Sequence, residues 1–298
     1  MVMVVALLAF QARSIEWHEV LTALENYPLS AAWSAVLLAI TSFTLYSCFD
    51  LLGRKYTGHG LGTCTVMATT FVSYAFNLNL GSLVGGVAMR YRLYSRLGLG
   101  PGVITRVMSI SMLTNWMGYV FLAGLVFSIY PPAVPASWGI QPVVLRLGGA
   151  GLLCLALGYV CACAFLGNRQ FNIRGHVIAL PSAGLACLQL LMGAANWLCM
   201  SGIIFVLLQQ RIEFPMVVGV LLLGAVAGVI THIPASLGVL EAVFVALLSH
   251  QMPQPDLLAG LVAYRVIYYI APLAIAVLAY LAMEVRGRKG RNRRSVPA

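Results

Sequence analysis

The stretch NLNLG at residues 77–81 breaks an otherwise apolar segment, and the stretch THIPAS at residues 231–236 breaks a second one. Each break is followed by an ionisable residue, Arg90 after the first and Glu241 after the second. Lipid offers backbone groups no hydrogen bonds, so a broken helix is stable at membrane depth only where protein or a water-filled cavity surrounds it. Corresponding breaks in two halves of a chain are typical of transporter folds built from inverted repeats. The breaks therefore predict two helical hairpins beside a working site.

The composition indicates a polytopic membrane protein, because 61% of the residues are hydrophobic and only 9% are charged. Continuous apolar segments long enough to cross about 30 Å of hydrocarbon lie at Ser30–Leu52, Val103–Ile129, Val143–Leu166, Gly184–Gln209 and Leu257–Met283. The N-terminal run Met1–Ala12 reaches only about half that thickness, so we expect the natural chain to start further upstream. We predict an all-α membrane protein of about six spanning helices plus two re-entrant hairpins.

Basic residues indicate the orientation, because arginines and lysines that flank spans are retained on the cytoplasmic side. The basic tail, residues 284–298, therefore predicts a cytoplasmic C-terminus. The remaining arginines fit only if segments 63–89 and 214–249 each enter and leave on one face of the membrane, as re-entrant hairpins. The alternative is that segment 63–89, which is apolar and long enough to span, crosses once.

The order of segments predicts a single membrane domain, residues 1–283, built as an inverted repeat. One half covers about residues 30–129 and the other about residues 184–283, each with the order span, hairpin, span. The helix at 143–166 joins them, and one crossing between the halves inverts the second relative to the first. Glycines spaced for close helix packing occur in both hairpins, Gly81 with Gly85 and Gly224 with Gly228.

Ionisable residues inside apolar spans usually pair or line a polar cavity. Glu241 and Arg265 are both expected roughly 12 to 13 Å deep, so the sequence predicts that they form an ion pair. Such a pair either fixes the second hairpin against the last helix or receives an anionic headgroup. The asparagines Asn77, Asn79, Asn115 and Asn196 are candidates for the same site or for hydrogen bonds between helices.

His232 lies beside a proline at the second break, where it either caps freed backbone groups or titrates near neutral pH. The seven cysteines lie mostly in apolar runs and are expected to be reduced packing residues. Cys161 and Cys163 point apart on a helix with no nearby histidine, which argues against a metal site. We expect no metal and no cofactor.

Two motifs resemble a known family. The run from Phe76 to Tyr94, which contains GGVAMRYRLY at residues 85–94, and the run from His232 to Glu241 resemble the transmembrane region of bacterial lysylphosphatidylglycerol synthases and their stand-alone relatives in Gram-negative inner membranes. In the synthases this region is associated with moving the lipid between leaflets, and a separate cytoplasmic domain makes the lipid. The family's usual glycine pair is replaced here by Ala235 and Ser236.

The resemblance implies lipid translocation without aminoacyl transfer, since no catalytic domain follows within the 298 residues. We expect a flippase for a phospholipid or another anionic lipid in the inner membrane of a Gram-negative bacterium, with no nucleic-acid partner. The expected lipid site contains Asn77, Asn79, Arg90, Tyr94, Asn115, Asn196, His232, Glu241 and Arg265. Two alternatives are a membrane enzyme that modifies a lipid headgroup and a non-catalytic partner of a lipid-synthesising enzyme.

Overall fold

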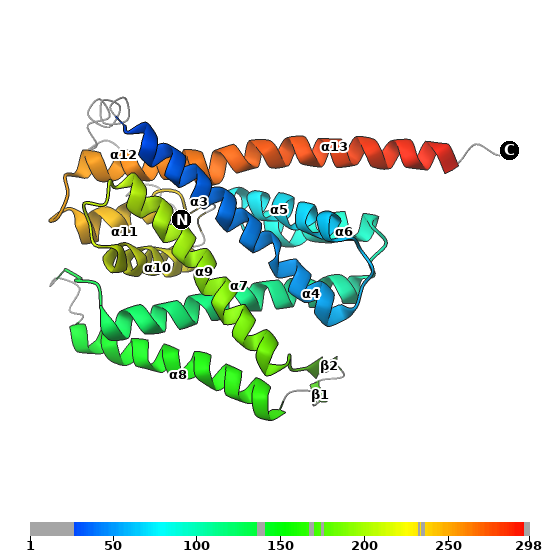
Figure 1. Ribbon diagram of the computed structural model, residues 1–298, viewed down its shortest axis with the longest axis horizontal. Helices are drawn as coiled ribbons and strands as arrows, with labels where there is room; N and C mark the ends of the chain where they lie inside the picture. Colours follow the sequence, from blue (N-terminus) through cyan, green and yellow to red (C-terminus); the bar gives the residue numbers. More distant parts are fainter. Residues whose placement is uncertain are drawn as a thin grey trace. The chain divides into compact units, whose positions relative to one another are not determined.

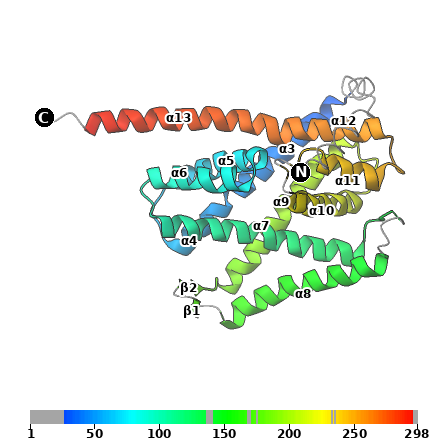
Figure 2. The same cartoon turned by 180° about the vertical axis from the view of Figure 1, so that it is seen from behind.

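Helices follow one another along nearly the whole described chain (Figures 1 and 2). The computed structural model describes residues 27–135, 141–166, 170–173, 176–231, 233 and 236–294. Helices satisfy most of their backbone hydrogen bonds within their own segment, which is the arrangement that hydrocarbon demands. The elements are α3 (Leu29–Ser47), α4 (Phe49–Thr57), α5 (Thr63–Leu80), the π-helix η1 (Ser82–Ala88), α6 (Met89–Arg96), α7 (Pro101–Ile129), α8 (Pro142–Leu166), β1 (Gln170–Ile173), β2 (His176–Ala179), α9 (Ala183–Leu207), α10 (Phe214–Thr231), α11 (Val239–Leu248), α12 (Gln254–Arg265), the π-helix η4 (Val266–Ile270) and α13 (Ala271–Arg294).

The predicted all-α membrane class is confirmed. Within the described residues, six helical stretches are long and apolar enough to cross a membrane: Leu29–Thr57, Pro101–Ile129, Pro142–Leu166, Ala183–Leu207, Phe214–Thr231 and Gln254–Val285. Five of them coincide with the continuous spans that the sequence predicts. The remaining one, Phe214–Thr231, is the first arm of the second predicted hairpin, so whether it crosses or re-enters stays a prediction.

A short antiparallel β-ladder between α8 and α9 was not predicted. Its strands β1 and β2 pair with Gln170 opposite Ala179 and Ile173 opposite His176. Four residues per strand are too few to give a recognisable alternation in the sequence. The basic tail also differs from expectation in one respect, because α13 runs on as helix to Arg294 without a boundary at residue 283.

The chain divides into two compact units, each of which contains one hairpin. The hairpin-1 unit is built from the described residues of Phe43–Ser111 and Val266–Ala298. The hairpin-2 unit is built from those of Met1–Ser42 and Met112–Arg265. The inverted repeat and the single membrane domain remain predictions.

The first predicted break is a helical turn at Gly81, where α5 ends. Gly81 has φ of 85°, a backbone conformation that residues with a side chain rarely adopt. Its amide donates to the carbonyl of Asn77 at 3.0 Å, which closes the last turn of α5. The following π-helix folds back along α5 so closely that a Cβ on Gly85 would lie 2.2 Å from the carbonyl carbon of Phe76. Of the predicted packing pair, Gly85 makes the close approach and Gly81 makes the turn.

The second predicted break separates α10 from α11, which pack against each other. Gly238, with φ of 74°, precedes the first turn of α11. A Cβ on Gly224 would lie 2.9 Å from Leu240 Cδ1, and one on Gly228 would lie 2.2 Å from Ser236 Oγ. Gly224 therefore faces the opposite arm and Gly228 faces the connecting segment, so α10, the break and α11 form a helical hairpin.

Replacing Gly85 with alanine should loosen the first hairpin, because the added methyl group meets backbone atoms of α5 that cannot rotate away. Overpacking of this kind costs about 1–3 kcal/mol. The expected result is a clearly lower thermal unfolding midpoint in detergent. The control is Gly158→Ala on α8, where a Cβ meets nothing within 4 Å. An equal effect of the two substitutions would contradict the close packing of η1 on α5.

Candidate functional site

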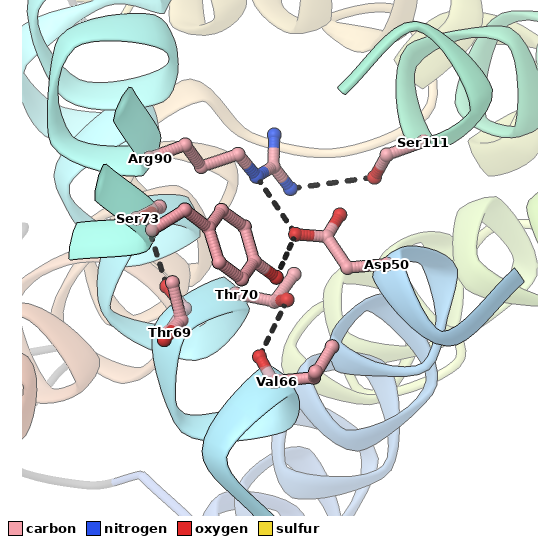
Figure 3. A network of polar contacts seen from close by, with 8 residues as sticks. Asp50, Val66, Thr69, Thr70, Ser73, Arg90 and Ser111 are labelled. Carbon is pink, nitrogen blue, oxygen red and sulfur yellow. Dashed lines mark hydrogen bonds and ion pairs between the residues drawn. The ribbon is translucent and has the colours of Figure 1, made fainter. Parts of the chain in front are cut away.

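A buried ion pair joins the first hairpin to the end of the first span. Arg90 of α6 places its Nε 3.2 Å from Oδ2 of Asp50 in α4, and the two side chains are only 2% and 0% exposed. Figure 3 shows the Arg90 guanidinium between Asp50 and Ser111, to whose Oγ it donates at 3.3 Å. The Tyr94 hydroxyl donates to the same Asp50 oxygen at 2.8 Å. Two carboxylate contacts thus hold α6 on α4.

This pair is shielded from solvent by aromatic rings. The Arg90 guanidinium lies 5.8 Å from the ring centre of Tyr46, an arrangement in which the ring face attracts the cation. Tyr46 stacks on Tyr74 with ring centres 3.5 Å apart, and the hydroxyls of Tyr74 and Tyr268 are hydrogen-bonded at 3.0 Å. Removing one partner of such a sealed pair leaves an uncompensated charge, so the network is a strong constraint on the fold.

The sequence pointed to Arg90 and Tyr94 but missed Asp50, the group that brings them together. Asp50 is the only acidic residue of the first predicted span and lies two residues from its end. That position looks like an ordinary membrane-surface carboxylate. Asp50 could have been found from the tendency of charged residues in apolar segments to pair with an opposite charge, which applies to Asp50 as much as to Arg90.

The predicted asparagines of the first hairpin make contacts that hold its tip. Asn79 Nδ2 donates to the carbonyl of Ala75 at 2.8 Å and to that of Tyr269, in η4, at 3.2 Å. Asn77 places its side-chain oxygen against Gly86, where a Cβ would lie 2.8 Å from Oδ1. Asn79 therefore joins α5 to η4, and Asn77 lies against η1; a role of either side chain in lipid binding stays a prediction.

The second hairpin carries the predicted ion pair between Glu241 and Arg265. The contact is bidentate: Nε donates to Oε1 at 2.6 Å and Nη2 to Oε2 at 3.1 Å. Nη2 also donates to the backbone carbonyl of Ser236 at 2.9 Å, within the break itself. The side chains of Arg265 and Glu241 are 12% and 19% exposed. Arg265 thus donates hydrogen bonds both to a carboxylate and to an irregular backbone segment.

Local structure explains why these two side chains meet. Glu241 lies in the first turn of α11, where the positive end of the helix dipole favours a carboxylate. Arg265 is the last residue of α12, immediately before the π-helix η4. Single π-helical turns inside helices occur frequently at functional sites. The change from α to π geometry was not evident in the sequence, which predicts one uninterrupted span there.

The remaining candidates of the hairpin-2 unit lie in helix contacts. Asn196 is buried, and its Oδ1 accepts from Ser42 Oγ at 2.7 Å. Asn115 contributes its backbone carbonyl, which accepts from Trp197 Nε1 at 3.3 Å. His232 lies outside the described residues. Within the part of the chain that the structure describes, no group of three histidines, cysteines or acidic residues is placed to hold a metal ion.

The structure thus assigns Asn77, Asn79, Arg90 and Tyr94 to the hairpin-1 unit, and Asn115, Asn196, Glu241 and Arg265 to the hairpin-2 unit. Among the ion pairs of the described residues, each unit has one arginine–carboxylate pair with both side chains less than 20% exposed, Arg90–Asp50 in the first and Arg265–Glu241 in the second. These observations define a polytopic helical membrane protein with two interrupted helical segments and two enclosed arginine–carboxylate pairs.

Comparison with known proteins identifies the family. Residues 1–276 match the family described as the lysylphosphatidylglycerol synthase TM region, so the chain belongs to that family. This confirms the resemblance that the two hairpin motifs indicated.

Three relatives illustrate its range. The inner membrane protein YbhN of Escherichia coli is 45% identical over 287 residues, which are 96% of this chain and 90% of that protein. The uncharacterized protein slr0712 of Synechocystis is 30% identical over 94% of this chain and 88% of its own length. A phosphatidylglycerol lysyltransferase of Staphylococcus haemolyticus is 28% identical over 92 residues, only 30% of this chain and 11% of that enzyme.

Replacing Asp50 with asparagine should destabilise the protein strongly, because Arg90 then stays buried without its counter-charge. Breaking a buried pair from one side costs about 3–5 kcal/mol. A double variant, Asp50→Asn with Arg90→Gln, should recover part of the loss in thermal unfolding midpoint.

Asp256→Asn is the matched control, since its partner Arg211 and Asp256 itself are 53% and 37% exposed. Exposed pairs contribute about 0–1 kcal/mol. If Asp50→Asn unfolds at the same temperature as Asp256→Asn, the buried pair does not hold the hairpin.

Proposed function

We propose that this protein moves an anionic phospholipid between the leaflets of a bacterial inner membrane, with Arg265 as the residue that contacts the headgroup phosphate. The single observation that carries the proposal is the Arg265–Glu241 pair, an arginine held at a helix break by groups that a phosphate can replace. Family membership and the membrane-spanning helices support the same reading.

The two charged pairs differ in the property that matters for a transient ligand. Arg90 and Asp50 are 2% and 0% exposed, so no headgroup reaches them without unpacking the hairpin. Arg265 and Glu241 keep 12% and 19% of their side-chain surface exposed. Among the predicted lipid-site residues, we therefore assign the headgroup contact to the second pair and a fixed structural role to the first.

The chemistry of the second pair suits exchange with a phosphodiester. A planar guanidinium binds carboxylate and phosphate oxygens in the same two-pronged geometry. A phosphate can therefore replace the Glu241 carboxylate on Nε and Nη2 without a change in the arginine's position. When Glu241 returns, it displaces the phosphate, so the lipid does not remain trapped. Transport requires binding that is favourable enough to enter the site and weak enough to leave it.

We also propose that the C-terminus is cytoplasmic and that the protein works without a chemical step on the lipid. The basic residues from Arg286 to Arg294 support the orientation, since such clusters stay on the cytoplasmic side. A headgroup-modifying enzyme would need a nucleophile beside a general base, and in this structure the Glu241 carboxylate is bound to Arg265 and not to a nucleophile. A lipid-synthesising enzyme is the expected kind of protein partner, because it would supply the transported lipid.

The experiment is translocation in vesicles that contain the purified protein and either fluorescent phosphatidylglycerol or fluorescent phosphatidylcholine. Transport of phosphatidylglycerol should fall about tenfold or more in Arg265→Gln and in Glu241→Gln, because a hydrogen bond to a charged group is worth about 1.5–3 kcal/mol. Arg211→Gln, which removes an exposed ion pair, should behave as the wild type.

Mass spectrometry of the recovered lipid accompanies the assay. Chemical conversion of the lipid would favour the enzyme reading instead. Wild-type protein that neither moves nor converts lipid would leave only the role of a non-catalytic partner, and unchanged transport in a folded Arg265→Gln protein would exclude the proposed headgroup contact.

A further inference from the structure

A basic pocket lies between the first span and the first hairpin. It has a volume of about 490 Å³ and is lined by Leu51, Arg54, Lys55, Gly58, His59 and Thr63. All of these residues belong to the hairpin-1 unit, and they come from the end of α4, the connecting loop and the first residue of α5. Ligand pockets generally have volumes of about 300–1,000 Å³.

The pocket is positively charged and its shape is fixed by the backbone. Gly58, in the left-handed conformation with φ of 70°, ends α4 and turns the chain along the pocket. Arg54 is half-buried, and its Nη1 donates to Thr63 Oγ1 at 2.9 Å, so the guanidinium is held between the two helices that border the pocket. Lys55 is exposed and adds a second cation. None of the lining residues is acidic.

His59 adds a hydrogen-bond donor for which the described residues provide no acceptor. Its Nδ1 accepts from the amide of Leu61 at 3.4 Å, so a neutral ring carries its proton on Nε2. Nε2 is shielded from solvent, and in the described part of the chain no group accepts a hydrogen bond from it. Burial lowers the pKa of His59 and the neighbouring Arg54 charge lowers it further, while the Asp50 charge opposes both, and the net lowering favours the neutral ring.

The acidic group nearest to this loop does not compete for the cations. The Asp50 charge acts on His59 by raising its pKa, but the carboxylate is fully buried and its Oδ2 is engaged by Arg90 and Tyr94. The described lining of the pocket therefore presents two cations and a threonine hydroxyl to whatever enters. Charged donors of this kind favour phosphate oxygens.

We propose that this pocket binds a phosphate group, carried either by a small soluble phosphate or by the headgroup of a phospholipid. Arg54 and Lys55 supply the charge, and the Thr63 hydroxyl, which accepts from Arg54, can donate its own proton to the phosphate. The proposal goes beyond the proposed function and does not depend on it, because binding here is an equilibrium property that needs no lipid movement. The simpler reading, that Arg54 and Lys55 only anchor the membrane topology, requires no binding at all.

The test measures equilibrium binding to the protein in nanodiscs in two arms, the first by calorimetry and the second by native mass spectrometry. One arm titrates inorganic phosphate and sn-glycerol 1-phosphate into nanodiscs of phosphatidylcholine alone. The other arm measures retention of phosphatidylglycerol by native mass spectrometry from mixed nanodiscs. Affinity in at least one arm should fall about tenfold in Arg54→Gln and in Lys55→Gln, since each removes a charged hydrogen bond.

The matched control is Arg106→Gln, which removes the same charge from an exposed position of α7 in the same unit and should change affinity less than twofold. Loss in the first arm alone identifies a soluble phosphate as the ligand, and loss in the second alone identifies a lipid headgroup. Lys55 is exposed, so Lys55→Gln keeps the test valid if Arg54→Gln fails to fold. Equal affinities of Lys55→Gln, Arg106→Gln and the wild type in both arms would overturn the proposal.

Discussion

Hydrocarbon cannot hydrogen-bond to a broken helix, and this constraint governs both hairpins. At the first break the amide of Gly81 closes on Asn77, and Asn79 reaches the backbone of η4. At the second, Arg265 donates to the carbonyl of Ser236 while it holds Glu241. The polar side chains of an apolar chain are thus concentrated where the backbone is irregular, because an unsatisfied backbone group there costs several kcal/mol. Each hairpin is stable only together with the polar groups that serve it.

The ion pairs of the two units differ in how far they are enclosed by protein. The Asp50–Arg90 pair is sealed beneath tyrosine rings and joins α4 to α6, so its contribution is to geometry. The Glu241–Arg265 pair remains partly accessible and lies where α12 changes into a π-helix. A charge that must meet a passing ligand cannot be sealed, whereas a charge that fixes a fold gains from exclusion of water. Exposure therefore separates the structural arginine from the candidate transport arginine, although both looked alike in sequence.

Most of the fold and part of the site could be predicted from the sequence. The features that could be predicted differ from the others in how clear a sequence pattern they leave. The breaks at residues 77–81 and 231–236 were visible because polar residues in an apolar run have few explanations, and the Glu241–Arg265 pair followed from depth and opposite charge. Asp50 was not predicted as a partner of Arg90, because a carboxylate near the end of a span is also common at the membrane surface. The roles of Gly81 and Gly85 were separable only from backbone geometry. The π-helices and the short β-ladder leave no periodic signal of their own.

The proposed topology depends most on the first hairpin entering and leaving the membrane on one side. The direct measurement uses a cysteine-free background with single cysteines at Gly60 and Ser95, exposed positions before α5 and at the end of α6. A membrane-impermeant thiol reagent is applied to intact spheroplasts and to inside-out vesicles. A re-entrant hairpin predicts that both positions react only in inside-out vesicles. Reaction of the two positions from opposite sides would show that residues 63–89 cross the membrane once. That result would contradict the re-entrant hairpin, and with it the placement of the flanking arginines on the cytoplasmic side.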